Sequence, residues 1–296
     1  MKIDPKDIST AKLHGYMLSA IAPRPICFAS TVDKDGNVNL SPYSFFNAFG
    51  SNPSTLIFSP ARRVRDNTTK HTLQNVLEVP EVVINVVNYD MVWQMSLAST
   101  EYEKGVNEFT KSGFTEEPSE VIKPPRVKES PVQFECKVRE VIETGQEGGA
   151  GNLIVCEIVM MHINDNVLDE DGTIDQHKID LVARLGKGWY ARASGDALFE
   201  IEKPLMNKGM GVDQLPDNIR LSTILTGNDL GQLGNVEAMP DEDTVEQFRK
   251  RDEMYSQINK QFAADQGTRR LQLHQYAQKL LEERKVNEAF CVLLSE

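Results

Sequence analysis

The sequence has few of the features that mark secreted, membrane-bound or metal-binding proteins. Its four cysteines, Cys27, Cys136, Cys156 and Cys291, form no Cys-x-x-Cys pair and no Cys/His spacing that suits a metal ion. No apolar run reaches the length of a membrane span, and the first ten residues lack the apolar core of a signal peptide. We therefore expect a cytoplasmic protein with free, buried thiols and no metal centre.

Positive charge is also scarce. The chain has 32 Lys and Arg against 44 Asp and Glu, a formal net charge of −12 and a pI of about 5.0. A protein that binds nucleic acid needs a basic face for the phosphates, and docking on anionic lipid needs basic residues as well. The composition therefore argues against nucleic-acid and membrane partners. It leaves room for an anionic cofactor, because a local basic cluster can lie in an acidic protein.

The sequence offers no convincing triad, carboxylate pair or metal cluster for catalysis. Ser9-x-x-Lys12 has the spacing of an acyl-transfer nucleophile, but its partner motifs are missing, and a polar turn that caps a helix explains it better. The run 186–191 (GKGWYA) fits G-x-G-x-x-A without a clear strand before it or helix after it. We interpret it as an aromatic-bearing loop near a cofactor.

Hydrophobic patterning predicts a mainly β fold with added helices. Ile26–Val32 and Val38–Ser44 flank Asp35-Gly36, a strong hairpin signal. Further strands are expected at Ser54–Ser59, Val82–Val87, Val132–Ile142 and Leu153–Ile163. The last two alternate apolar and polar residues at period two. Helical segments are inserted irregularly between these strands, which favours a barrel over a doubly wound sheet.

The stretch Ser41–Thr72 joins an aromatic-rich strand pair to a basic loop. Its first half, SPYSFFNAFGSNPSTLIF, could pack against a flat ring, and its second half, SPARRVRDNTTKHT, could hold an anion. That combination suits a nucleotide-like cofactor such as FMN. Just upstream, Pro23-Arg24-Pro25 fixes the backbone on both sides of one arginine, which loses less freedom when it binds a ligand. The alternative is a rigid strand entry with a solvated arginine.

The basic loop leads into an expected helix that Asn67 or Thr68 would cap and whose apolar side carries Leu73, Val76 and Leu77. The start of a helix offers unpaired N–H groups and the positive end of a dipole. With the side chains of Ser59, Arg62, Arg65, Thr68, Lys70 and Thr72, it would suit a phosphate monoester. The alternative is an ordinary capped surface helix with solvated arginines.

The character of the sequence changes near residue 204. Lys203–Asn235 is irregular and rich in Gly, Asn, Asp and Leu, and we expect it to pack on the main domain. Apolar residues recur at helical spacing over Val245–Phe262 and again over Leu273–Leu281. This predicts two amphipathic helices docked on the barrel or on a partner subunit.

From Pro23 to Thr72 the sequence resembles the flavin reductase-like, FMN-binding split-barrel family. The residues that carry the resemblance are Pro23-Arg24-Pro25-Ile26, the Asp-Gly hairpin, Ser41-Pro42-Tyr43-Ser44-Phe45-Phe46-Asn47, Asn52-Pro53, Ser59, and Lys70-His71-Thr72 with Asn75. The likeness continues through the two long strands to Arg184-Leu185-Gly186 and Tyr190, and so covers roughly the first two-thirds of the chain.

The resemblance implies a homodimeric split β-barrel that binds FMN, formed by residues 1–203. Residues 204–296 lie outside the resemblance, and we expect them to form an irregular cap segment and a C-terminal helical extension. The Gly/Asn-rich, semi-apolar make-up of Leu225–Asn235 suggests a cap over the flavin of the same or the neighbouring subunit. Beside the isoalloxazine the resemblance would place Ser41, Pro42, Tyr43, Ser44 and Asn47, with Arg24 beside the cofactor and Tyr190 near it. At the phosphate end it would place Ser59, Arg62, Thr68, Lys70 and Thr72.

The resemblance also implies hydride transfer from NADH or NADPH to FMN, with reduced flavin or electrons passed to a monooxygenase or other redox partner. The flavin supplies the chemistry and the protein supplies position and electrostatics, so no catalytic side chain is expected. Two departures matter. The family commonly has Lys-Asp-Thr at Lys70-His71-Thr72, and many of its reductases have Gly-Asp-His near Gly149–Asn152, where the His helps seat the nicotinamide.

Two alternatives to a reductase therefore stay open. One is an electron carrier that holds FMN and has no nicotinamide site of its own. The other is a flavin-free binding or structural protein on the same scaffold. The retained Ser41–Ser44, Lys70 and Thr72 count against the flavin-free protein.

Overall fold

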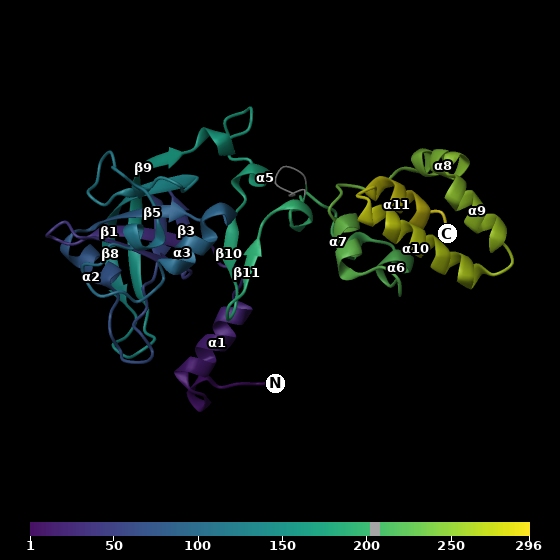
Figure 1. Cartoon of the computed structure of the whole chain (residues 1–296). Coiled ribbons are helices and arrows are strands. Elements are labelled where there is room, and N and C mark those ends of the chain that lie inside the picture. The colour runs from purple at the N-terminus through teal and green to yellow at the C-terminus, as the bar shows by residue number, and fades with distance from the viewer. Residues whose placement is uncertain (202–207) are drawn as a thin grey trace. The chain divides into compact units, whose positions relative to one another are not determined.

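The computed structural model of the chain describes residues 1–201 and 208–296 (Figure 1). The chain divides into two compact units, Met1–Phe199 and Glu200–Glu296. The predicted domain boundary after residue 203 falls at a position that lies outside the described residues. Within the described ranges, no helix is long and apolar enough to cross a membrane.

The first unit is built on one seven-stranded antiparallel sheet (Figure 1). Its strands are β1 (Cys27–Val32), β2 (Val38–Tyr43), β3 (Phe46–Ser51), β4 (Ser54–Phe58), β5 (Glu81–Val86), β8 (Val132–Glu143) and β9 (Asn152–Ile163). They lie in the order β2-β1-β5-β8-β9-β4-β3. Two short ribbons flank the sheet: β6 (Glu116–Glu117) pairs with β7 (Arg126–Val127), and β10 (Val182–Arg184) with β11 (Tyr190–Arg192).

The order of the strands requires the sheet to curl. β2 and β3 lie at opposite edges, although only Ser44 and Phe45 separate them in the chain. Neighbouring strands lie about 4.8 Å apart, so two residues could not join the edges of a flat sheet of this width. The N–H of Ser59, just after β4, donates to the carbonyl of Phe45 at 2.9 Å and closes this side. The predicted split barrel is therefore confirmed, with its added helices.

Alternation along β1 explains how the unit is packed. Cys27 and Ala29 face the barrel interior, together with Phe58 and Ile84, whereas Phe28 faces outward. The helical segments of this unit are η1 (Pro5–Asp7), α1 (Thr10–Ala20), α2 (His71–Glu78), η2 (Tyr89–Met91), α3 (Val92–Leu97), α4 (Glu108–Ser112), η3 (Asp165–Val167), α5 (Gln176–Ile179) and η4 (Gly195–Ala197). Those from η2 to α4 bury Met91, Met95 and Phe109 against Phe28. Both faces of β1 are thus covered.

The helix after the basic loop starts later than predicted. α2 begins at His71, with Lys70 as its N-cap and no side-chain cap hydrogen bond. The capping prediction for Asn67 or Thr68 is wrong because both side chains are used inside the loop, where Asn67 adopts a left-handed φ of 57°. Leu77 is also 64% exposed rather than on the apolar side. By contrast, Ser9 does cap a helix, accepting from the N–H of Lys12 at 3.3 Å.

The thiol prediction is confirmed, because all four cysteines are free and buried. Burial raises the pKa of Cys27 and Cys136 well above the ordinary value and that of Cys156 to about 12. These thiols therefore stay protonated at neutral pH and behave as small apolar side chains.

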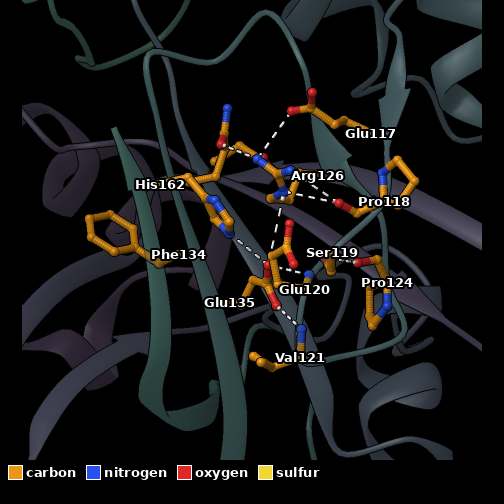
Figure 2. Close-up of polar contacts among 12 residues, drawn as sticks. Glu117, Pro118, Ser119, Glu120, Val121, Pro124, Arg126, Phe134, Glu135 and His162 are labelled. Atoms are coloured by element: carbon orange, nitrogen blue, oxygen red, sulfur yellow. Dashed lines mark hydrogen bonds and ion pairs between the residues drawn. The ribbon is translucent and has the colours of Figure 1, made fainter. Parts of the chain in front are cut away.

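A buried carboxylate holds the segment 116–127 on the sheet (Figure 2). Glu135 of β8 is fully buried and accepts from the N–H groups of Glu120 and Val121, each at 2.8 Å. His162 of β9 lies 2.7 Å from the same carboxylate through Nε2, and Arg126 lies 3.9 Å away. These contacts fix the loop to the sheet through a buried polar group.

The second unit is helical. Its elements are η5 (Val212–Gln214), α6 (Asp217–Arg220), α7 (Gly227–Gly234), α8 (Glu242–Arg251), α9 (Glu253–Gln261), α10 (Gln266–Glu282) and α11 (Val286–Leu293). The first predicted amphipathic helix is broken at Asp252, which ends α8 and caps α9 by accepting from the N–H of Tyr255 at 2.7 Å. The predicted helical extension is present, with more helices than expected.

The described part of the irregular segment, 208–235, contributes to the core of this helical unit. Leu215, Ile219, Leu225 and Leu233 are buried with apolar residues of α8, α10 and α11. α7 begins with a capping box at Thr226. The Thr226 hydroxyl accepts a hydrogen bond from the N–H of Asp229, and the Asp229 carboxylate accepts one from the N–H of Thr226. The four buried apolar side chains are therefore part of the core of the second unit, and the cap over the flavin stays a prediction.

Candidate functional site

A pocket of about 310 Å³ opens beside the loop between β4 and α2. Its lining residues are His14, Ala61, Arg62, Arg63, Val64, Arg65, Lys70, Glu101 and Gly149. Four of these side chains are cationic and one is a carboxylate, so the pocket favours a ligand with negative charge. It lies entirely within the first unit.

The basic loop is folded by its own polar side chains. Arg62 donates through Nε and Nη2 to the side-chain and backbone oxygens of Asn67, at 2.7 and 3.0 Å. Arg63 donates through Nη1 to Thr68 Oγ1 at 2.9 Å and to the Thr69 carbonyl at 2.8 Å. These contacts hold two guanidinium groups in place without a carboxylate partner inside the loop.

The turn between β8 and β9 supports the loop from behind. The N–H of Arg62 donates to Ala150 at 2.9 Å, and the N–H of Gly149 donates to Arg62 at 3.0 Å. Gly149 has a φ of +94°, and a Cβ there would meet Thr10 Cγ2 at 3.0 Å. A glycine is therefore required where α1, this turn and the basic loop meet.

The charges of the pocket perturb one another. Hydrogen bonds from Arg65 and Arg63 lower the pKa of Glu101 to about 2. Burial, and next the positive charge of Arg63, lower the pKa of Lys70. Burial and the same arginine lower the pKa of His71. The cations are crowded together, and an added anion would relieve their repulsion.

Three of the predicted phosphate residues, Arg62, Arg65 and Lys70, line the pocket. Thr68 lies on the rim of the loop, where its hydroxyl donates to Asp66 and accepts from Arg63. The hydroxyl of Thr72 is fully buried and accepts from Asn39 at 2.9 Å and from the Tyr43 hydroxyl at 2.8 Å. Ser59 accepts from the N–H of Asn152 at 3.0 Å. Thr72 and Ser59 thus connect strands and helices of the barrel.

His71, one of the two departures from the family pattern, lines a different cavity. This space of about 10 Å³ also touches Asp33 and Asn39 and has room for about one water. His71 is therefore separated from the basic pocket that Lys70 lines.

The residues expected beside the flavin ring lie at and near β2 and β3. Ser41, Pro42 and Ser44 are partly exposed, and Asn47 is exposed on the edge strand β3. Tyr43 turns inward, and burial raises the pKa of its hydroxyl to about 12. Tyr190 lies on β11, with the Arg184 guanidinium 4.6 Å from its ring centre.

Arg24 is 5% exposed, and four of its hydrogen bonds reach other parts of the first unit. Nη1 donates to the carbonyls of Leu18 and Ile21 at 2.6 and 2.5 Å, at the end of α1. Nη2 donates to Leu185 at 3.0 Å, and Nε to Ser44 Oγ at 3.3 Å. Arg24 therefore ties α1, the β10–β11 ribbon and the end of β2 together.

We expect Arg24→Met to lower the free energy of unfolding of the first unit by about 2–4 kcal/mol, because three partly buried carbonyls lose a charged donor. Urea unfolding followed by circular dichroism measures the loss. The matched control is Arg139→Met, which removes an exposed arginine paired only with Glu157 and should cost under about 1 kcal/mol. Equal losses in the two variants would contradict this role.

Six lining residues are absent from the sequence-based site: His14, Ala61, Arg63, Val64, Glu101 and Gly149. Arg63 stands between two candidate arginines and could have been included on that ground. Glu101 and Gly149 come from distant segments and carry no local signal. They reach the pocket only because α3 and the β8–β9 turn lie beside the loop in the fold.

An open antiparallel barrel with a cationic pocket at one loop defines a scaffold suited to an anionic cofactor. A family model described as "Flavin reductase like domain" matches residues 18–181. The chain belongs to this family, and its first unit has the flavin-binding fold.

Relatives support this assignment. An uncharacterized protein of Aquifex aeolicus (strain VF5) is 35% identical over 196 residues, which cover 66% of this chain and 97% of that protein. Nitrilotriacetate monooxygenase component B from Bacillus cereus is 27% identical with a TM-score of 0.63, covering 68% of this chain and 98% of that one. A split-barrel protein of the flavin reductase type from Shewanella frigidimarina NCIMB 400 is 27% identical with a TM-score of 0.58, and the match covers 69% of this chain and 99% of that protein. About a third of this chain has no counterpart in these proteins.

Proposed function

We propose that this protein is a flavin reductase that binds FMN and transfers hydride to it from NADH or NADPH. The observation that carries the proposal is the cluster of Arg62, Arg63, Arg65 and Lys70 around one pocket of a flavin reductase-like domain. These residues fit a phosphate ester, because guanidinium and ammonium groups are its strongest partners in proteins.

In this proposal the loop holds the 5′-phosphate and the β2–β3 region lies along the ring. Arg62, Arg63 and Lys70 neutralise the phosphate, and their fixed positions reduce the entropy lost on binding. Ser41–Ser44 and Asn47 offer backbone and side-chain groups at the ring edge, with Tyr190 as an aromatic neighbour. FMN, when bound, supplies the hydride-accepting ring. The protein supplies binding, orientation and hydrogen bonds to the ring.

A second candidate function is an FMN electron carrier without a nicotinamide site. Asn152 stands near the place where many reductases of the family have a histidine. It is fully buried, its N–H donates to Ser59 Oγ at 3.0 Å, and its Nδ2 donates to the Pro60 carbonyl at 2.9 Å. A side chain used in this way is not available to seat a nicotinamide, which favours the carrier.

Anaerobic reduction distinguishes the two functions. The FMN-loaded protein is mixed with NADH and, separately, with NADPH while the flavin absorbance is followed. A reductase bleaches rapidly with at least one donor, and the faster reaction names the donor. A protein that bleaches with dithionite and with neither nucleotide is an electron carrier.

We further propose a homodimer in the cytoplasm that serves a monooxygenase or another redox partner. The exposed side chains of Phe49 (64%) and Trp93 (83%) support burial against a second copy, and the free cysteines suit a reducing compartment. The similarity to a monooxygenase component supports the partner. Sedimentation at the mass of a single chain would contradict the dimer. Recovery of the protein outside the cytoplasmic fraction would contradict the location.

A further inference from the structure

One carboxylate lies among the cations of the basic pocket. Glu101, which follows α3, has Oε1 at 2.9 Å from Arg63 Nε and Oε2 at 3.0 Å from Arg65 Nη2. Lys70 Nζ lies 3.6 Å from Oε1. Among the residues that line the pocket, Glu101 is the only acidic one. It therefore contacts three of the four cations that the proposed function assigns to a phosphate.

The carboxylate holds its charge throughout the physiological range. Hydrogen bonds from Arg65 and Arg63 keep its pKa at about 2, so it is ionised at any pH above about 4. Its side chain is 44% exposed, and it sits on a connecting segment rather than within a helix or strand. An exposed side chain on a loop can change rotamer at low cost. Glu101 can therefore leave the cations when another anion takes its place.

A phosphate and this carboxylate cannot use the same donors at once. Arg63 Nε and Arg65 Nη2 each point one N–H at Glu101. A phosphate in contact with these groups would also lie against the negative charge of Glu101, and like charges at such distances repel. Binding of the phosphate therefore requires the displacement of the carboxylate.

We propose that Glu101 is an internal competitor for the phosphate site: it occupies Arg63, Arg65 and Lys70 and thereby weakens the grip on the 5′-phosphate of the flavin. This inference rests on the proposed FMN function. A reductase that hands reduced flavin to a partner must release it, and an internal anion lowers the affinity without removing the cations that give specificity for FMN. Glu101 thus sets how readily the flavin exchanges.

A supporting role for Glu101 would change the FMN affinity of a substituted protein in the opposite direction. If Glu101 were a support that positions Arg63 and Lys70, its loss would loosen the phosphate site. If it competes, its loss tightens the site. The direction of the change in FMN affinity on substitution therefore separates the two roles.

The test compares wild type, Glu101→Gln, Glu101→Ala and the control Glu103→Gln. Glu103 is exposed on the same segment and does not line the pocket, so its variant removes an equal charge without these contacts. The flavin-free proteins are titrated with FMN and with riboflavin by fluorescence quenching, and with inorganic phosphate by calorimetry. Thermal unfolding without ligand checks that each variant is folded.

We expect both Glu101 variants to bind FMN about tenfold more tightly than wild type, the effect of one competing charged contact. Inorganic phosphate should also bind more tightly to the Glu101 variants, whereas their affinity for riboflavin should stay unchanged. The Glu103→Gln variant should bind all three ligands as wild type does. Weaker or unchanged FMN binding in both Glu101 variants, with wild type still preferring FMN to riboflavin, would overturn the inference alone. Equal wild-type affinity for FMN and riboflavin would overturn the proposed phosphate site and this inference with it.

Discussion

Lys70→Ala should weaken FMN binding by about ten- to a hundredfold and leave riboflavin binding unchanged. Riboflavin has the same ring and ribityl chain but no phosphate, so the comparison isolates the anion contact. One charge-assisted hydrogen bond contributes about 1.5–3 kcal/mol, which corresponds to that range of affinity. Lys70 stands at the N-cap of α2 and lines the pocket, with 29% of its side chain exposed. It is thus partly shielded from water, where such contacts are stronger.

The control for this prediction is Lys128→Ala, which removes an exposed lysine on the segment after β7 that is absent from the pocket. Its FMN affinity should match that of wild type. Fluorescence quenching by each flavin gives both dissociation constants in one experiment. If Lys70→Ala lowers FMN and riboflavin affinity to the same extent, the lysine acts on the ring or on the fold and the phosphate assignment fails.

FMN affinity should also fall at alkaline pH, and the fall should begin at a lower pH than it would if Lys70 had the ordinary pKa of a lysine. Burial and the neighbouring Arg63 lower the pKa of Lys70, so it loses its proton at a lower pH than usual. A bound phosphate would favour the charged form and raise that pKa again, so FMN binding is linked to proton uptake on the alkaline side. In Lys70→Ala this part of the pH dependence should disappear.

Glu135→Ala should lower the free energy of unfolding by about 3 kcal/mol. The substitution leaves the N–H groups of Glu120 and Val121 without their acceptor and removes the partner of His162. The two N–H groups are partly buried, and each hydrogen bond to a charged acceptor contributes about 1.5–3 kcal/mol. The loop that these contacts hold, seen in Figure 2, should become accessible to protease. Glu140→Ala, an exposed position on the same strand, should change stability by under about 0.5 kcal/mol.

The contribution of Glu135 should depend on pH. Burial alone would raise the pKa of Glu135, but hydrogen bonds from Glu120, Val121 and His162 outweigh it and lower the pKa below the ordinary 4.5. A carboxylate with a lowered pKa stabilises the fold above its unfolded-state value and loses that contribution as the pH falls through the folded-state value. Urea unfolding at pH 7 and again below pH 4 should therefore show the gap between wild type and Glu135→Ala narrowing in acid. If the difference in the free energy of unfolding between the two proteins does not change with pH, packing of the Glu135 side chain rather than its charge stabilises the fold.

The strands of the barrel could be predicted because their signals are local. The Asp35-Gly36 turn and the alternation in the two long strands depend on residues that are neighbours in sequence, and β1, β2, β8 and β9 lie where these signals place them. The bounds of the C-terminal helices are harder to predict from the sequence. Asp252 interrupts an otherwise continuous apolar stripe by capping a new helix, and such a cap competes with the continuing helix in a way that periodicity does not show.

The site was predicted in part. Residue type alone places Arg62 and Lys70 at a basic loop, and both line the pocket. Which way a hydroxyl turns cannot be read from sequence, and Thr72 turns inward to Asn39 and Tyr43. Glu101 was missed because its part in the pocket depends on contacts with a loop more than thirty residues earlier in the chain.

The position of the phosphate in an FMN complex tests the central claim most directly. A crystal structure of the protein with FMN should place the phosphate within hydrogen-bond distance of Lys70 and of at least one of Arg62, Arg63 and Arg65, with the ring along β2. A phosphate that points into solvent, or that binds another part of the chain, would contradict the account.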